Sequence, residues 1–210
     1  MDKKEATILI RREIESDYRY VEEMTRNAFW NRYHPGCSEH FVLHQFRDRP
    51  EFVPELDLVL EVDHRIVAHI MYTYALIHCD DESILPVLSF GPVSVLPEFQ
   101  KQGYGERLIR FSMKQAYLMG AGGIAITGDP NYYQRFGFES AQDRGIYYPG
   151  IPREEKTPFF MVVDLIPGYF DCKVGTYEEP EGYHVDEEAL KQFDQSFPPL
   201  VQQILPGQLG

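Results

Sequence analysis

A strand, a glycine turn and a helix follow one another in residues 93–105, and this stretch constrains the fold more than any other part of the chain. The β-branched run Val-Ser-Val ends at Leu96-Pro97, and Gln-x-x-Gly-x-Gly then opens a helix with an apolar face. A helix that starts just after a strand directs its unpaired amides and the positive end of its dipole to one point. Because Gly103 and Gly105 have no Cβ atom, a phosphate can approach this backbone closely. The stretch therefore predicts an α/β fold with an anion site at the turn.

The glycine spacing argues against two common nucleotide-binding motifs. The chain has no Gly-x-x-x-x-Gly-Lys-Ser/Thr sequence, and Leu108 stands where the third glycine of a dinucleotide site would lie. The motif that matches is the Gln/Arg-x-x-Gly-x-Gly/Ala turn of the GCN5-related N-acetyltransferases (GNAT proteins). In that family the turn follows a strand, as it does here after Val-Ser-Val-Leu-Pro. The stretch thus resembles the cofactor-binding turn of a GNAT protein.

A second motif lies one helix and one strand further along the chain. Residues 128–138 read Gly-Asp-Pro-Asn-Tyr-Tyr-Gln-Arg-Phe-Gly-Phe and contain the Tyr-x-x-x-Gly-Phe pattern that GNAT proteins carry at this place, with Tyr133 as its tyrosine. The whole segment is similar to that of the YhbS-like subgroup of N-acetyltransferases. Two motifs in the expected order support the resemblance better than either one alone.

The periodicity of apolar residues predicts the order β-α-α-β-β-β-α-β-α-β over residues 8–166. The resemblance implies the GNAT acyl-CoA N-acyltransferase fold, an α/β (α+β) fold whose mixed central sheet is splayed between its two central strands and flanked by helices. Gly91-Pro92 interrupts the strand predicted at 85–95 and indicates a bulge. The expected strands lie at 8–14, 58–62, 66–74, 85–95, 123–127 and 159–166, and the second and third of them are predicted to form a hairpin around residues 63–65. The expected helices start after Ser16 or Asp17, after Ser38, at the 100–105 turn and at residues 128–131.

The composition changes after Pro167, which divides the chain into two predicted parts. Residues 1–167 would form the GNAT acetyltransferase domain, and residues 168–210 a C-terminal extension. Within the extension, residues 177–183 are polar and predict a loop, and Asp186 predicts the start of a short helix. We expect this helix to pack on the core through Leu190 and Phe193.

Charge and cysteine content narrow the range of partners. A formal net charge of −13 argues against nucleic-acid binding, which requires basic side chains to neutralise phosphates. Cys37, Cys79 and Cys172 lie far apart and form no Cys-x-x-Cys pair, so they predict neither a disulfide framework nor a zinc site. The N-terminus lacks the apolar region of a signal peptide, and no apolar stretch is long enough to span a bilayer. We therefore expect a cytoplasmic protein without nucleic-acid or membrane partners.

The resemblance implies acetyl-CoA as co-substrate, with its pyrophosphate on the glycine turn and its pantetheine arm on the splayed strands. A backbone N–H near Val93 would stabilise the oxyanion, and Tyr133 would donate a proton to the leaving thiolate. Tyr132 is the neighbouring alternative for this acid. The residues expected to contact the cofactor are Val93, Ser94, Val95, Gln100, Lys101, Gln102, Gly103, Tyr104, Gly105, Asn131 and Phe136.

The sequence does not identify the general base that would deprotonate the amine. A lysine-like amine has a pKa of about 10.4, so its deprotonation at pH 7 costs about 4–5 kcal/mol. Glu61, His69 and Glu98 are candidates by location, and water chains to Ser89 are a further alternative. We expect no metal, because His34, His40 and His44 lack acidic or cysteine partners at ligand spacing. Direct transfer also needs no cysteine nucleophile.

These inferences lead to an expected function with three alternatives. The expected enzyme transfers the acetyl group of acetyl-CoA to a primary amine of a small molecule, peptide or protein. Its acceptor pocket would be bounded by the first two helices, by Tyr72 and Tyr74, and by the C-terminal tail. The alternatives are a catalytically silent CoA-binding regulatory module, an acyltransferase that uses another short acyl-CoA, and an interaction protein that assembles, for example as a homodimer, through residues 168–210.

Overall fold

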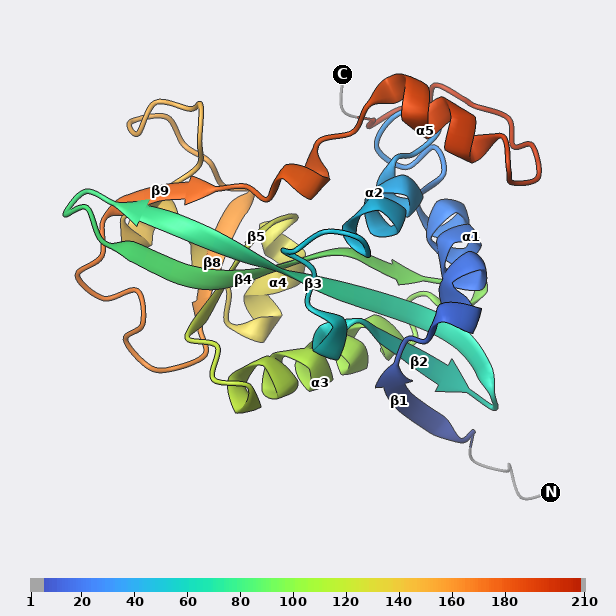
Figure 1. The fold of residues 1–210 in the computed structure, drawn as a ribbon, viewed down its shortest axis with the longest axis horizontal. Helices are drawn as coiled ribbons and strands as arrows, with labels where there is room; N and C mark the ends of the chain where they lie inside the picture. The colour runs from blue at the N-terminus through green and yellow to red at the C-terminus, as the bar shows by residue number, and fades with distance from the viewer. Residues whose placement is uncertain (1–5, 209–210) are drawn as a thin grey trace. The chain divides into compact units, whose positions relative to one another are not determined.

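The chain divides into two compact units, and two strands and one helix have residues in both of them. The computed structural model describes residues 6–208 (Figure 1). The first unit combines Met1–Met71, Pro92–Ile109 and Gly182–Gly210, and the second combines Tyr72–Gly91 and Arg110–Glu181. Both unit boundaries after Met71 and Gly91 fall inside strands, and the boundary after Ile109 falls inside a helix. The boundary predicted after residue 167 does not coincide with this division and stays a prediction.

The strands form one mixed sheet, in agreement with the predicted fold class. Their order is β1-β2-β3-β4-β5-β8-β6, with β9 paired to β3 and β7 paired to β9. The strands are β1 (Ile8–Arg12), β2 (Leu58–Val62), β3 (Arg65–Cys79), β4 (Ile84–Val95), β5 (Gly123–Thr127), β6 (Glu139–Ser140), β7 (Ile146–Tyr147), β8 (Phe160–Asp164) and β9 (Gly175–Glu178). The helices are α1 (Tyr18–Phe29), α2 (Glu39–Phe46), α3 (Tyr104–Leu118), α4 (Pro130–Tyr133) and α5 (Glu187–Asp194).

In the first unit, β1, β2 and the first half of β3 form an antiparallel meander. Leu60 pairs with Ile10 of β1 on one side and with Ala68 of β3 on the other. Asp63 and His64 connect β2 to β3 with φ angles of 49° and 67°. Two consecutive residues with positive φ are the signature of the two-residue turn that matches the twist of paired strands. The predicted hairpin is therefore confirmed.

The end of the chain belongs to the first unit, where α5 packs beside α1 and α2 (Figure 1). Asp186 caps α5 by accepting a hydrogen bond from the Ala189 amide (2.8 Å), as predicted. The Phe193 ring lies 4.3 Å from the His44 ring and 5.5 Å from the His40 ring of α2. Residues 182–208 are thus part of the packing of this unit.

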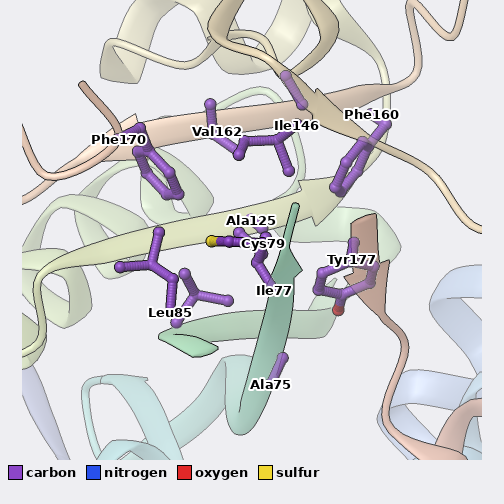
Figure 2. Close-up of a cluster of buried hydrophobic side chains, with 12 residues drawn as sticks. Ala75, Ile77, Cys79, Leu85, Ala125, Ile146, Phe160, Val162, Phe170 and Tyr177 are labelled. Carbon is purple, nitrogen blue, oxygen red and sulfur yellow. The ribbon is translucent and has the colours of Figure 1, made fainter. Parts of the chain in front are cut away.

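In the second unit, β5 lies between β4, to which it is parallel, and β8, to which it is antiparallel. A buried apolar cluster covers one face of these strands (Figure 2). Ala75 and Ile77 of β3 alternate with exposed neighbours, as expected for a strand with one buried face. Phe160, Phe170 and Tyr177 contribute the large rings of the cluster.

Strand β9 corrects the loop predicted at 177–183. Tyr177 is buried and pairs with Ile77 of β3, so the chain is extended at the start of that segment. The surrounding residues are polar, and a single aromatic residue gives no period-two pattern. The strand forms because β3 offers unpaired backbone groups at its edge and the cluster offers space for the tyrosine ring. Among residues 6–208, no helix has the length and apolarity needed to cross a membrane.

Candidate active site

The glycine turn of the first unit leaves its backbone open. Gly103 has a φ of 87°, and a Cβ atom built on it would meet no atom within 4 Å. The side chains of the turn bond back to the chain: Gln100 Nε2 donates to the Val95 carbonyl (3.0 Å) and Gln102 Nε2 donates to the Glu98 carbonyl (2.8 Å). These two side-chain hydrogen bonds stabilise the turn and leave space at Gly103 for an approaching anion.

Helix α3 begins directly after this turn. The Arg107 amide donates to the Gly103 carbonyl (2.9 Å), whereas the amides of Tyr104 and Gly105 have no carbonyl one turn earlier in the helix. Arg107, Arg110 and Lys114 are exposed and lie at i, i+3 and i+7, on one face of α3. This basic face on an acidic chain was not part of the sequence prediction, although its spacing along the helix was visible there.

The predicted residues at the end of β4 do not share one environment. The Ser94 side chain is buried, and its Oγ lies 2.9 Å from Thr25 Oγ1 of α1. Val93 and Val95 are half-buried and point to the opposite face of the strand. Because the Val95 carbonyl already accepts the Gln100 bond, we expect cofactor contacts here through the remaining backbone groups and the valine side chains.

The parting of the two central strands is visible within the second unit. In the described residues, Leu88 and Ile124 are the one Cα pair between β4 and β5. β5 continues to Thr127, and β4 reaches Gly91 with a φ of 149° and then Pro92, which has no amide hydrogen. Both features loosen the ladder at the position where the sequence predicts a bulge.

The tyrosine segment of the second unit is held by aromatic packing. Asp129 caps α4 by accepting a bond from the Asn131 amide (2.9 Å), and a Cβ atom on Gly128 would lie 2.5 Å from the Tyr133 ring. Only glycine at 128 therefore allows this ring to lie against the end of β5. The ring centroid is 5.9 Å from that of Phe90 and 5.8 Å from that of Phe138. Tyr133 is half-buried, so its side chain is held by its neighbours and is still partly accessible.

The other predicted residues of this segment differ in exposure. Asn131 is exposed, and its side-chain amide donates to Asp129 Oδ1 (3.0 Å). Phe136 is buried, and the Arg110 guanidinium carbon lies 5.0 Å from its ring centre. Arg110 also donates to the Arg135 carbonyl (3.0 Å). A cofactor contact at this point would thus involve the two arginines more than the Phe136 ring.

Two expectations about other residues need correction. Tyr72 does not line an open pocket: its side chain is fully buried, and its hydroxyl is 2.8 Å from Ser112 Oγ of α3. His40 does have cysteine and acidic neighbours, since its Nδ1 lies 3.5 Å from Cys37 Sγ and its Nε2 lies 3.1 Å from Asp194 Oδ1. Asp194 is at the same time paired with Arg26, so this group is an ion-pair cluster.

The candidate bases all have structural partners. Glu61 accepts a bond from Arg11 Nε (2.7 Å), and exposed Glu98 accepts one from Arg65 (2.7 Å). Ser89 is buried. His69 is fully buried, with Nε2 at 2.7 Å from Asp57 Oδ1. None of these contacts selects one of them as the base.

His69 belongs to a buried cluster with Glu13 and Asp57 in the first unit. His69 Nε2 is 3.9 Å from Glu13 Oε2, and the Arg47 guanidinium donates to both oxygens of Glu13 at 3.0 Å. The positive charge of a guanidinium this close to Glu13 opposes the binding of a cation. The adjacent carboxyl groups of Glu13 and Asp57 favour a proton shared between them. Burial raises the pKa of Glu13 to about 8, raises the pKa of Asp57, and lowers the pKa of His69 to about 4.

This cluster predicts a stability that changes little between pH 4.5 and 6.5 and falls above pH 6.5. The folded-state pKa of Glu13 lies above its ordinary value of 4.5, so its stabilising contribution is full below pH 4.5 and is lost as the pH rises towards 8. The folded-state pKa of His69 lies below its ordinary value of 6.5, so the contribution of His69 rises between pH 4 and 6.5 and offsets the fall from Glu13 over that range. Above pH 6.5 the free energy of unfolding should fall by up to about 1.4 kcal/mol per pH unit.

Urea unfolding between pH 5 and 9 measures this dependence. Glu13→Gln removes the titrating group and keeps a hydrogen-bonding side chain, so the fall between pH 6.5 and 8 should flatten. Glu55→Gln, at an exposed position of the same unit, should leave the profile unchanged. An alkaline fall that persists in Glu13→Gln would assign the titration to another group.

Residues 56–140 match the family model of the acetyltransferase (GNAT) domain. The chain is 36% identical over 113 residues to YjhQ of Escherichia coli strain K12, an uncharacterised N-acetyltransferase; the match covers 51% of this chain and 60% of that protein. The chain thus matches less than two thirds of this relative's length.

Two solved structures have similar folds. The GNAT family N-acetyltransferase YhbS of Escherichia coli, in complex with CoA, superposes with a TM-score of 0.72 at 21% identity, over 87% of this chain and 95% of that one. A GNAT family acetyltransferase of Brucella melitensis, in complex with acetyl-CoA, gives a TM-score of 0.68 at 26% identity, over 85% and 99%. The fold is thus similar to that of GNAT proteins, as the two motifs predict, and residues 56–140 match the GNAT domain model.

Proposed function

We propose that this protein transfers the acetyl group of acetyl-CoA to a primary amine. The observation that carries the proposal is the glycine turn, which is open at Gly103 and leads into the N-terminus of α3. The pyrophosphate of acetyl-CoA is an anion that such a turn binds through amide hydrogens and the helix dipole. The GNAT domain match and the acetyl-CoA complex of the Brucella relative support this ligand.

The basic side chains around the turn favour a ligand with several phosphates. Lys101 in the turn and Arg107 in the first turn of α3 are exposed, although the chain as a whole carries a net charge of −13. A local cluster of cations on an acidic protein attracts an anionic ligand to that place and repels it elsewhere. CoA carries a 3′-phosphate in addition to its pyrophosphate, so these residues would add affinity and salt dependence.

In the proposed reaction, the lone pair of the amine nitrogen attacks the thioester carbonyl carbon and forms the new N–C bond. The carbonyl oxygen becomes an oxyanion, for which the Val93 amide is the proposed donor. The C–S bond then breaks, and the sulfur leaves with the electron pair. Tyr133 gives its phenolic proton to this thiolate, and the proton lost by the amine restores the phenol through solvent. The products are an acetamide and free CoA.

Tyr133 is the proposed acid because its ring is restrained by packing and not fully buried. A phenol with an ordinary pKa of about 10 is protonated at pH 7 and can donate. Tyr132 lies in the same helix, α4; the plane of its ring is at 88° to that of the Tyr133 ring, and the ring packs against Phe136. The two ring planes are therefore nearly perpendicular, and the position of Tyr133 in the Tyr-x-x-x-Gly-Phe pattern favours it as the acid.

Calorimetric titration with acetyl-CoA and with CoA tests the cofactor. We expect Gly103→Ala to weaken binding about tenfold, because a Cβ atom would stand where the phosphate approaches. Gly150→Ala is the matched control: Gly150 also has positive φ and open space around it, but lies in a loop of the second unit. Its variant should bind CoA as the wild type does.

The titration also separates the alternatives. No binding at millimolar ligand would contradict the proposal as a whole. Binding without turnover on a panel of amines would favour the regulatory module, and faster turnover with propionyl- or succinyl-CoA would favour another acyl donor. Equal weakening by Gly103→Ala and Gly150→Ala would show that backbone strain, and not the turn, controls affinity.

A further inference from the structure

A buried pair of hydroxyl groups joins α1 to the last residues of β4. Thr25 Oγ1 lies 2.9 Å from Ser94 Oγ, and the two residues are 0% and 1% exposed. Both belong to the first unit. A hydroxyl buried without a partner loses its hydrogen bonds to water and gains nothing in return, so each group depends on the other. Either atom can be the donor, and the pair restrains the strand at Ser94.

This restraint lies next to the residue that the reaction needs. Ser94 follows Val93, whose amide is the proposed oxyanion donor, and side chains alternate along the strand. The Ser94 side chain therefore points to α1, while Val93 faces the other way. Moving Ser94 along or away from α1 would shift the Val93 Cα atom and with it the Val93 amide, because consecutive rigid peptide units are joined at that Cα atom.

The strand needs such a restraint because it is locally weakened. Pro92 provides no amide hydrogen, and Gly91 has a φ of 149°. Beyond Ser94, the Val95 carbonyl accepts a bond from the Gln100 side chain, and the Leu96 amide donates to the Val67 carbonyl of β3 (2.9 Å). Between Pro92 and these bonds, the Thr25–Ser94 pair is a side-chain hydrogen bond that ties β4 to α1.

We infer that Thr25 is a positioning residue for acetyl transfer: through Ser94 it holds the Val93 amide where the oxyanion develops. The inference rests on the proposed function and adds a residue outside both sequence motifs. Thr25 touches neither the acetyl group nor the amine in this scheme. Its effect should therefore fall on the chemical step, because a small displacement of an oxyanion donor weakens the transition state far more than the ground state.

The test compares steady-state kinetics and CoA affinity of three variants with the wild type. Thr25→Val keeps the shape and removes the hydroxyl; we expect kcat to fall about tenfold while the Kd for acetyl-CoA changes less than about twofold. Thr25→Ser keeps the hydroxyl and should retain kcat within about twofold. Tyr20→Phe is the matched control, because the Tyr20 hydroxyl also bonds α1 to the sheet, at the Ile66 carbonyl (3.1 Å), but not to β4.

A double-mutant cycle asks whether Thr25 acts through Ser94. In a Ser94→Ala background, Thr25→Val should lower kcat no further, because the bond is already lost. Additive losses, an unchanged kcat in Thr25→Val, or an equal loss in Tyr20→Phe would each overturn the inference. If Thr25→Val does not fold, the kinetics of Ser94→Ala and Thr25→Ser still test the inference. The kcat should fall in Ser94→Ala and be retained in Thr25→Ser, while the Kd for acetyl-CoA stays nearly unchanged in both. A wild type that neither binds nor uses acetyl-CoA would instead contradict the proposed function.

Discussion

Tyr133→Phe is expected to lower kcat at least about 100-fold, while the Kd for acetyl-CoA stays within about twofold of the wild type. The variant removes the proton that the leaving thiolate would take and keeps the ring. The ring is what packs against Phe90 and Phe138, so the segment should stay folded. Stopped-time assays of free CoA with a saturating amine, together with calorimetric titration, measure the two quantities.

Tyr132→Phe is the matched control for this variant. It removes a neighbouring phenol from the same short helix and should change kcat by less than about threefold, since Tyr132 does not occupy the tyrosine position of the Tyr-x-x-x-Gly-Phe pattern. The reverse result, with the large loss in Tyr132→Phe, would transfer the acid role to Tyr132. A loss of acetyl-CoA affinity in Tyr133→Phe equal to the loss of kcat would indicate a binding role in place of acid catalysis.

Asp194→Ala is expected to lower the free energy of unfolding by about 3 kcal/mol. Asp194 of α5 accepts two bonds from Arg26 of α1, at 2.6 and 3.0 Å, and the Arg26 side chain is only 2% exposed. Without the carboxylate, the buried guanidinium would keep the Pro198 carbonyl (2.9 Å) and the Trp30 and Phe197 rings as partners, none of which carries a negative charge. Because Asp194 itself is 28% exposed, the loss should lie at the lower end of the range for buried pairs.

Urea denaturation measures this loss, with two comparisons. Glu188→Ala removes an exposed carboxylate from the same helix, 3.9 Å from Lys191, and should cost less than about 0.5 kcal/mol. Arg26→Met combined with Asp194→Leu removes both charges and should recover at least half of the stability lost in Asp194→Ala. A single variant as stable as the wild type would show that α5 is held by its aromatic contacts alone.

The Asp194 result bears on how the C-terminal segment should be described. Besides Asp194, the tail contributes the Val201 carbonyl, which accepts bonds from the Trp30 ring nitrogen (3.0 Å) and the Asn31 side chain (2.9 Å). These bonds hold the connection between α1 and α2. We therefore expect truncation after residue 181 to destabilise the first unit, so an oligomer lost on truncation would not by itself identify the tail as an interface.

The sequence alone determined the parts of this protein that depend on short stretches of chain. The glycine turn at 100–105 and the segment at 128–138 are local, and their spacing specifies backbone shape before any distant contact forms. The same holds for the Asp63-His64 turn and for the Asp186 cap, which the structure confirms. Apolar periodicity was sufficient for the order of the longer elements from β1 to α4 and for β8, because a helix or strand face is a property of neighbouring residues. It missed the short strands β6, β7 and β9.

Only the tertiary structure decided which distant residues meet. Thr25 and Ser94 are 69 positions apart, and Arg26 and Asp194 are 168 apart. Glu13, Asp57 and His69 meet because a loop before α1, a loop before β2 and a strand converge in one buried place. Strand β9 exists because β3 offers it an edge. Such pairings depend on loop closure and on the burial that the whole core provides, and neither leaves a periodic trace in the sequence.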